Sequence, residues 1–169
     1  MKISTEFDTI VGFAREEAMR TGSYSIEADH LLLGILRHRD NEAVEMLRDQ
    51  GLDPDEMKRR VDSLVFHEHC IPFDDEDSIR LGRDGSSAVN LAIAEAMSEG
   101  SEQAGALHLL KAIYKQGGSV SSDYLHSKGF MPSGQKAPKK ERAEATAAPG
   151  PELLGKLLST IRINTKIVS

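Results

Sequence analysis

Apolar residues recur every three or four positions along residues 4–66, which is the spacing of helices that each bury one face. The first predicted helix begins at Ser4 or Thr5, whose hydroxyls can accept hydrogen bonds from free backbone amides, and it ends at Gly22. Four helices are therefore expected in this part of the chain, at about 4–22, 27–38, 41–50 and 53–64. The inward positions of the fourth helix, which opens with Asp53-Pro54, are Met57, Val61 and Leu64.

The same pattern occurs a second time. Sliding the chain against itself by 78 residues aligns 4–52 with 82–130 without a gap, and 14 of the 49 paired positions are identical. Most identities fall at apolar and glycine positions, so one structural unit is used twice. The second copy repeats three of the four helices, at about 86–99, 104–116 and 119–128.

The fourth helix of the second copy is missing from its expected place. Residues 131–150 are rich in proline, glycine, alanine and lysine, which is typical of a flexible linker. Within 151–169, the residues from Pro151 to Ile161 place five apolar side chains on one helical face. This C-terminal amphipathic helix is interpreted either as the displaced fourth helix or as a helix that binds a partner. The expected organisation is one domain over 1–130, with repeats at about 4–66 and 82–130.

Charge and composition exclude several classes of function. The net charge is −6, but residues 1–130 carry 14 basic against 24 acidic side chains, whereas 131–169 carry 7 against 3. An acidic body argues against a nucleic-acid surface, which needs clustered cations. No segment has the 18 or so apolar residues of a membrane-spanning helix, no secretory signal is visible, and Cys70 is the only cysteine. We therefore expect a cytoplasmic protein without nucleic-acid or membrane partners.

One stretch of the first repeat resembles a known motif. Residues 28–36 read ADHLLLGIL, and they follow a helix that ends in Glu16-Glu17-Ala18 and a Gly22-Ser23 turn. This pattern, used twice, resembles the Clp repeat of the N-terminal domain of Clp-type AAA+ unfoldases. The resemblance covers 4–130. It implies an all-α fold in which two pseudo-twofold-related four-helix repeats form one compact bundle.

The resemblance also implies a function. Domains of this family recruit protein substrates and adaptors to an unfoldase ring, so we expect a non-catalytic protein-binding module without a cofactor, whose partners include a Clp AAA+ unfoldase. In the bacterial C-type members, the domain binds phosphoarginine through a hydroxyl at the first helix start and an acidic residue before the repeated histidine. Ser4 and Asp29 occupy these positions in repeat 1, whereas repeat 2 has Gly82 and Leu107. Ligand binding is therefore predicted at Ser4 and Asp29 only.

Two other motifs suggest chemistry, and each is incomplete. Residues 150–156 match the start of a phosphate-binding loop, but Leu157 stands where a Ser or Thr hydroxyl is needed for Mg²⁺. The cluster His67-Glu68-His69-Cys70 is dense in potential zinc ligands, yet no second ligand pair is evident. No metal site is therefore predicted. A small metal-dependent hydrolase using this cluster is the alternative function, and a regulator that docks on another protein through 151–168 is a third.

Overall fold

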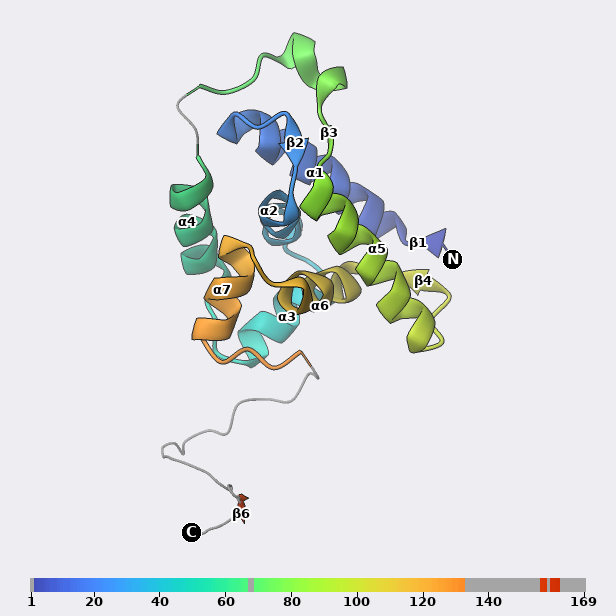
Figure 1. Cartoon of the computed structure of the whole chain (residues 1–169), viewed down its shortest axis with the longest axis vertical. Coiled ribbons are helices and arrows are strands. Elements are labelled where there is room, and N and C mark those ends of the chain that lie inside the picture. Colours follow the sequence, from blue (N-terminus) through green and yellow to red (C-terminus); the bar gives the residue numbers. More distant parts are fainter. Residues whose placement is uncertain (1, 67–68, 133–155, 158, 162–169) are drawn as a thin grey trace. The chain divides into compact units, whose positions relative to one another are not determined.

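The computed structural model describes residues 2–66, 69–132, 156–157 and 159–161. The chain divides into two units, 1–135 and 136–169, and the first contains all the described helices (Figure 1). No helix in the described residues is long and apolar enough to cross a bilayer. The helices of the first unit are α1 (Thr5–Thr21), α2 (Ala28–His38), α3 (Glu42–Asp49), α4 (Pro54–Val65), α5 (Arg83–Ser98), α6 (Ala106–Gln116) and α7 (Val120–Ser127), with a 3₁₀ helix, η1 (Phe73–Ser78), between α4 and α5.

The ends of the helices in repeat 1 are confirmed. The Ser4 hydroxyl accepts a hydrogen bond from the backbone amide of Phe7 at 3.0 Å and caps α1. Gly22 ends this helix with φ of 87°, a left-handed conformation that glycine adopts without steric penalty. Asp53 caps α4 through the amide of Asp55, and a proline occupies the first turn.

Four short strands connect the two repeats and show their symmetry. β1 (Lys2–Ile3) pairs in parallel with β4 (Gln103–Ala104), and β2 (Ser25–Ile26) pairs in parallel with β3 (Arg80–Leu81). The 78-residue offset converts β1 into β3 and β2 into β4, so it converts one strand pair into the other in the same register. Exchange of equivalent partners is the mark of a twofold axis. The predicted pseudo-twofold, all-α fold is confirmed.

Side-chain contacts follow the same symmetry. Arg37 of α2 forms an ion pair with Glu17 of α1 at 3.3 Å, and the equivalent Lys115 of α6 pairs with Glu95 of α5 at 2.6 Å. Glu17 is buried and is held also by Arg20, which pairs with Asp62 of α4 as well. Burial of a carboxylate is tolerated here because cations surround it.

The core lies on the predicted faces of the helices. α2 is central and contacts α1, α4, α5, α6 and α7 (Figure 1). The side chains of Leu31, Leu32 and Leu33 are fully buried, as are Leu109 and Leu110 of α6. One continuous apolar cluster therefore joins the two repeats.

Repeat 2 has no counterpart of α4 within the described residues. The side chains of α6 differ from those of α2 on the side where α4 packs in repeat 1. The buried Leu33 of α2 is replaced in α6 by Lys111, which bonds Glu99. The Tyr114 ring stacks on the ring of His126 at 4.1 Å between centroids, and the ring of Phe130 packs against Tyr114 at 5.4 Å. These rings join α6 to α7 and to the residues that follow α7.

Two expectations differ from the structure. Leu64 was predicted to face the core with Met57 and Val61, but it is 57% exposed, because in the last turn of α4 it is Val65 that packs against the core. Of the predicted C-terminal helix, only β5 (Lys156–Leu157) and β6 (Ser159–Ile161) are described, and they are extended rather than helical. β-branched residues at 160 and 161 favour an extended backbone. The rest of 151–169 and most of the predicted linker 131–150 lie outside the described residues.

Candidate functional site

The repeated histidines hold the starts of the second helices. The Nδ1 atom of His30 accepts a hydrogen bond from the Glu27 amide at 3.0 Å, and that of His108 accepts one from the Gly105 amide at the same distance. Each Nε2 atom then faces an equivalent position, Thr21 at 3.2 Å in repeat 1 and Glu99 at 3.0 Å in repeat 2. Because the backbone amide must donate, Nδ1 is unprotonated in both rings. The histidines therefore cap the second helix of each repeat.

Ser4 lies at a junction between the repeats. Its amide donates to the Ala104 carbonyl at 2.9 Å, which brings the start of α1 next to the start of α6. A cleft of about 400 Å³ opens between these two helix starts. We call it the α1–α6 cleft. Its lining residues are Ser4, Glu6, Glu42, Glu99, Ser101, Gln103, Gly105, Ala106, Leu107 and His108.

The α1–α6 cleft is acidic. The Glu6 carboxylate accepts a hydrogen bond from the Ala106 amide at 3.2 Å and so occupies the free amide at the start of α6. A hydrogen bond from His108, together with the nearby Lys111, lowers the pKa of Glu99, which therefore stays ionised. Glu42 makes no ion pair with any described residue. The cleft thus offers three carboxylates, and neither lysine nor arginine is among its lining residues.

The symmetry-related junction is closed by a side chain. The amides of Asp84 and Gly85, at the start of α5, donate to the Glu27 carboxylate at 3.1 and 3.2 Å. A Cβ atom at Gly82 would lie 2.2 Å from an oxygen of this carboxylate, so glycine leaves the space that Glu27 fills. An anion would bind at these amides, and the protein's own carboxylate already occupies the position.

Asp29 has a structural contact. Its Oδ1 atom accepts hydrogen bonds from the amide and the hydroxyl of Ser121 at 2.8 and 2.6 Å. Ser121 lies in the first turn of α7, so the carboxylate joins α2 of repeat 1 to α7 of repeat 2 and neutralises the helix start.

The structure places Ser4 and Asp29 at different junctions. Ser4 follows β1 and lines the α1–α6 cleft together with Leu107. Asp29 lies after β2, which pairs with β3, and β3 is followed by Gly82. Each junction combines the first helix of one repeat with the second helix of the other. The predicted hydroxyl and carboxylate are therefore split between them. The sequence analysis also missed Glu6, Glu27 and Glu42, because it looked for site residues within one repeat. The 78-residue offset shows which positions are equivalent, but it does not show that the first helix of one repeat contacts the second helix of the other.

Replacement of Glu27 by alanine is expected to lower the free energy of unfolding by about 1 kcal/mol, the usual loss when a helix start loses its capping acceptor. Gly82→Ser alone forces the Glu27 carboxylate out and is expected to destabilise the domain slightly. In the Glu27→Ala background, Gly82→Ser should instead stabilise it, because the new hydroxyl can cap α5. Urea denaturation of the single and double variants measures the effect, and additive values would contradict the contact.

The alternative metal site is only partly described. His67 and Glu68 lie outside the described residues, and His69 and Cys70 are exposed. Among the described residues, no three histidine, cysteine, aspartate or glutamate side chains are grouped as metal ligands. The hydrolase interpretation therefore gains no support from the described part of the connector.

The fold and the junctions define a class of domain: an all-helical bundle made of two interleaved copies of one unit, with a cleft where the copies meet. The sequence matches the Clp repeat N-terminal domain over residues 2–128, and the chain belongs to this family.

Known relatives agree with this assignment. The chain is 26% identical over 120 residues to the negative regulator of genetic competence ClpC/MecB of Bacillus subtilis, and equally to the chaperone protein ClpB of Oceanobacillus iheyensis. The match covers 71% of this chain but 14% of either relative, so the chain spans a small part of their length.

Solved structures with the same fold include two N-terminal domains of chaperones. The Hsp104 N-terminal domain of Candida albicans superposes with a TM-score of 0.63 at 13% identity, covering 79% of this chain and 86% of that one. The N-terminal domain of the caseinolytic protease-associated chaperone ClpD of Arabidopsis thaliana gives 0.60 at 13% identity, covering 78% and 90%. At these identities the likeness concerns the fold.

Proposed function

We propose that this chain is a non-catalytic protein-binding module that recruits substrate or adaptor proteins to a Clp-type unfoldase. Membership of the Clp repeat family supports this function. The observation that carries it is the α1–α6 cleft, an open recess of about 400 Å³ at the point where the two repeats meet. Its three carboxylates and the apolar Leu107 fit a basic side chain with an aliphatic stem, such as arginine or lysine in an unfolded segment.

Phosphoarginine is the more specific ligand that the family resemblance suggests. In this chain Glu27 engages the two amides at the start of α5, and Glu6 engages an amide at the start of α6, so these donors are not open to a phosphate. A phosphate would also meet the carboxylates of Glu42 and Glu99 in the open cleft. We therefore propose that the cleft selects unmodified basic side chains over phosphorylated ones.

Calorimetry with three versions of one short unfolded peptide tests the cleft. The peptide carries a central arginine, citrulline or phosphoarginine. We expect the arginine peptide to bind most tightly, and Glu42→Gln to weaken it by about two- to fivefold, the range of an exposed ion pair. Glu45→Gln is the matched control, because Glu45 is exposed on the same helix but does not line the cleft. Equal binding of the citrulline peptide, or tighter binding of the phosphoarginine peptide, contradicts this selectivity.

Recruitment needs a separate test. The full chain, immobilised and exposed to extract of its native cell, is expected to enrich an AAA+ unfoldase or its adaptors, as identified by mass spectrometry. An extract that yields a bound metal-dependent activity in place of these proteins would favour the hydrolase alternative.

A further inference from the structure

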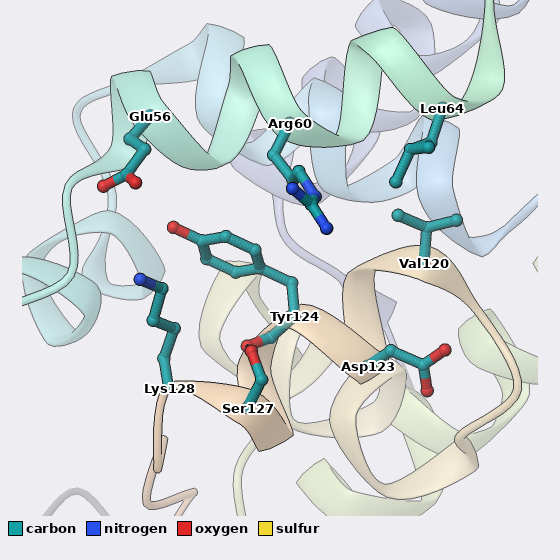
Figure 2. Close-up of a pocket in the computed structure, with 8 residues that line it drawn as sticks. All are labelled: Glu56, Arg60, Leu64, Val120, Asp123, Tyr124, Ser127 and Lys128. Atoms are coloured by element: carbon teal, nitrogen blue, oxygen red, sulfur yellow. The ribbon is translucent and has the colours of Figure 1, made fainter.

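A second recess lies on a different part of the domain, between α4 of repeat 1 and α7 of repeat 2 (Figure 2). It has a volume of about 480 Å³. We call it the α4–α7 groove. Its lining residues are Glu56, Arg60, Leu64, Val120, Asp123, Tyr124, Ser127 and Lys128.

The residues of the α4 wall are not part of the core. On α4, Glu56, Arg60 and Leu64 are spaced four apart and form one ridge, beside the fully buried Met57 and Val61 that anchor the helix. Leu64 is 57% exposed. An anchored helix with an outward ridge is a preformed surface, which lowers the entropy lost on binding.

The groove has an apolar end. Leu64 and Val120 face each other across it from the two helices, as Figure 2 shows. An apolar side chain inserted between Leu64 and Val120 would remove surface of both residues from water.

The rest of the groove is lined by acidic and basic side chains that are not paired with one another. Glu56, Arg60, Asp123 and Lys128 form no ion pair with any described residue, in contrast to the acidic residues of α1 and α5 that are paired. Each wall therefore presents one acid and one base. The Lys128 ammonium lies 5.5 Å from the centroid of the Tyr124 ring.

Tyr124 lies in the middle of the groove. Burial and the nearby Glu56 and Asp53 raise the pKa of its hydroxyl, so the hydroxyl stays protonated at neutral pH. It makes no hydrogen bond with any described residue. An aromatic face with a free polar tip is a frequent anchor at protein interfaces.

We propose that the α4–α7 groove binds an amphipathic helix of a partner protein. The partner helix places an apolar side chain between Leu64 and Val120, and an acidic and a basic side chain one to two turns away, where Arg60 and Asp123 are unpaired. A helix fits because both walls are helical ridges, and a ridge packs into the groove of another helix. The groove-lining residues belong to α4, α7 and the residue after α7, so no strand edge is offered to an extended peptide.

This surface is independent of the proposed function of the α1–α6 cleft. The two recesses share no lining residue, and Ser4 and Glu42 belong only to the cleft. Failure of either surface in its own test leaves the other unaffected.

The test uses the full chain and a displayed library of peptides of about 14 residues, four turns of helix, built on an alanine-rich background with one randomised face. Selected peptides are expected to carry an apolar residue and charges of both signs at helical spacing. Leu64→Lys is expected to raise the Kd of the best peptide by at least about tenfold, the effect of losing an apolar anchor contact. Arg60→Glu should weaken binding, and exchange of the peptide's acidic residue for lysine should restore it.

Met97→Lys is the matched control. Met97 is 62% exposed and, like Leu64, is the penultimate residue of its helix, but it lies outside the groove. Its variant is expected to bind the peptide as the unchanged chain does, and so is Ser4→Ala. Circular dichroism confirms that each variant is folded. The proposal is overturned if no peptide is enriched, if Leu64→Lys and Met97→Lys bind equally, or if light scattering shows that the groove joins two copies of this chain.

Discussion

Replacement of Gly85 by alanine is expected to lower the free energy of unfolding by about 3 kcal/mol, the upper part of the usual range for overpacking. Gly85 is buried in the first turn of α5, where this helix crosses β2. A Cβ atom there would lie 2.0 Å from the carbonyl oxygen of Ile26. The nearest atoms are backbone of Ile26 and Glu27, and Ile26 is held by the pairing of β2 with β3, so these atoms cannot readily move aside. Thermal unfolding should shift down by about 10 °C.

Gly12→Ala is the control for this prediction. Gly12 is exposed in the middle of α1, and a Cβ atom there would meet nothing within 4 Å. Alanine favours the helix, so the variant is expected to gain about 0.5–1 kcal/mol. If Gly85→Ala left stability unchanged, α5 would not approach β2 as closely as the structure shows.

Leu32→Ala and Leu110→Ala are each expected to cost about 2–5 kcal/mol, because each removes a buried side chain and leaves a cavity. The two leucines are equivalent under the 78-residue offset and both are fully buried, on α2 and α6. Guanidinium denaturation measures the loss.

Leu64→Ala serves as the comparison, since Leu64 is 57% exposed. Its effect is expected to stay within about 0.5 kcal/mol, as for other surface substitutions. Negligible effects at both Leu32 and Leu110 would show that the inward faces of α2 and α6 are assigned incorrectly.

Most of the helices could be predicted because their signals are local. Ser4, Gly22, Asp53 and Pro54 act on the backbone within one turn, and the apolar spacing of α2 reports its own buried face. Leu64 continues the same spacing, yet in the last turn of α4 Val65 packs against the core and Leu64 stays 57% exposed. The spacing of apolar residues tells which side of a helix is apolar. Which of these residues are buried depends on the neighbouring helices, and these are known only from the fold.

The site depends on contacts between the repeats, which spacing alone did not reveal. The sequence placed Ser4 and Asp29 in one unit because they are close along the chain, but the crossed strand pairs separate them. Glu27 gave no signal of its own, since a glutamate before a helix is common. Its role depends on Gly82, which is 55 positions away and leaves the space that its carboxylate fills.

Because the strands pair between the repeats, each repeat needs the other to complete its hydrogen bonds. β1 and β2 pair with strands of the second repeat, and the carboxylates of Glu6 and Glu27 both accept hydrogen bonds from backbone amides of the second repeat. The exposed segment around Phe73 that links the repeats carries none of these contacts. A protease that cut there would leave two fragments still bound to each other. Two separately expressed halves should therefore complement each other and fold only as a pair, in one cooperative transition.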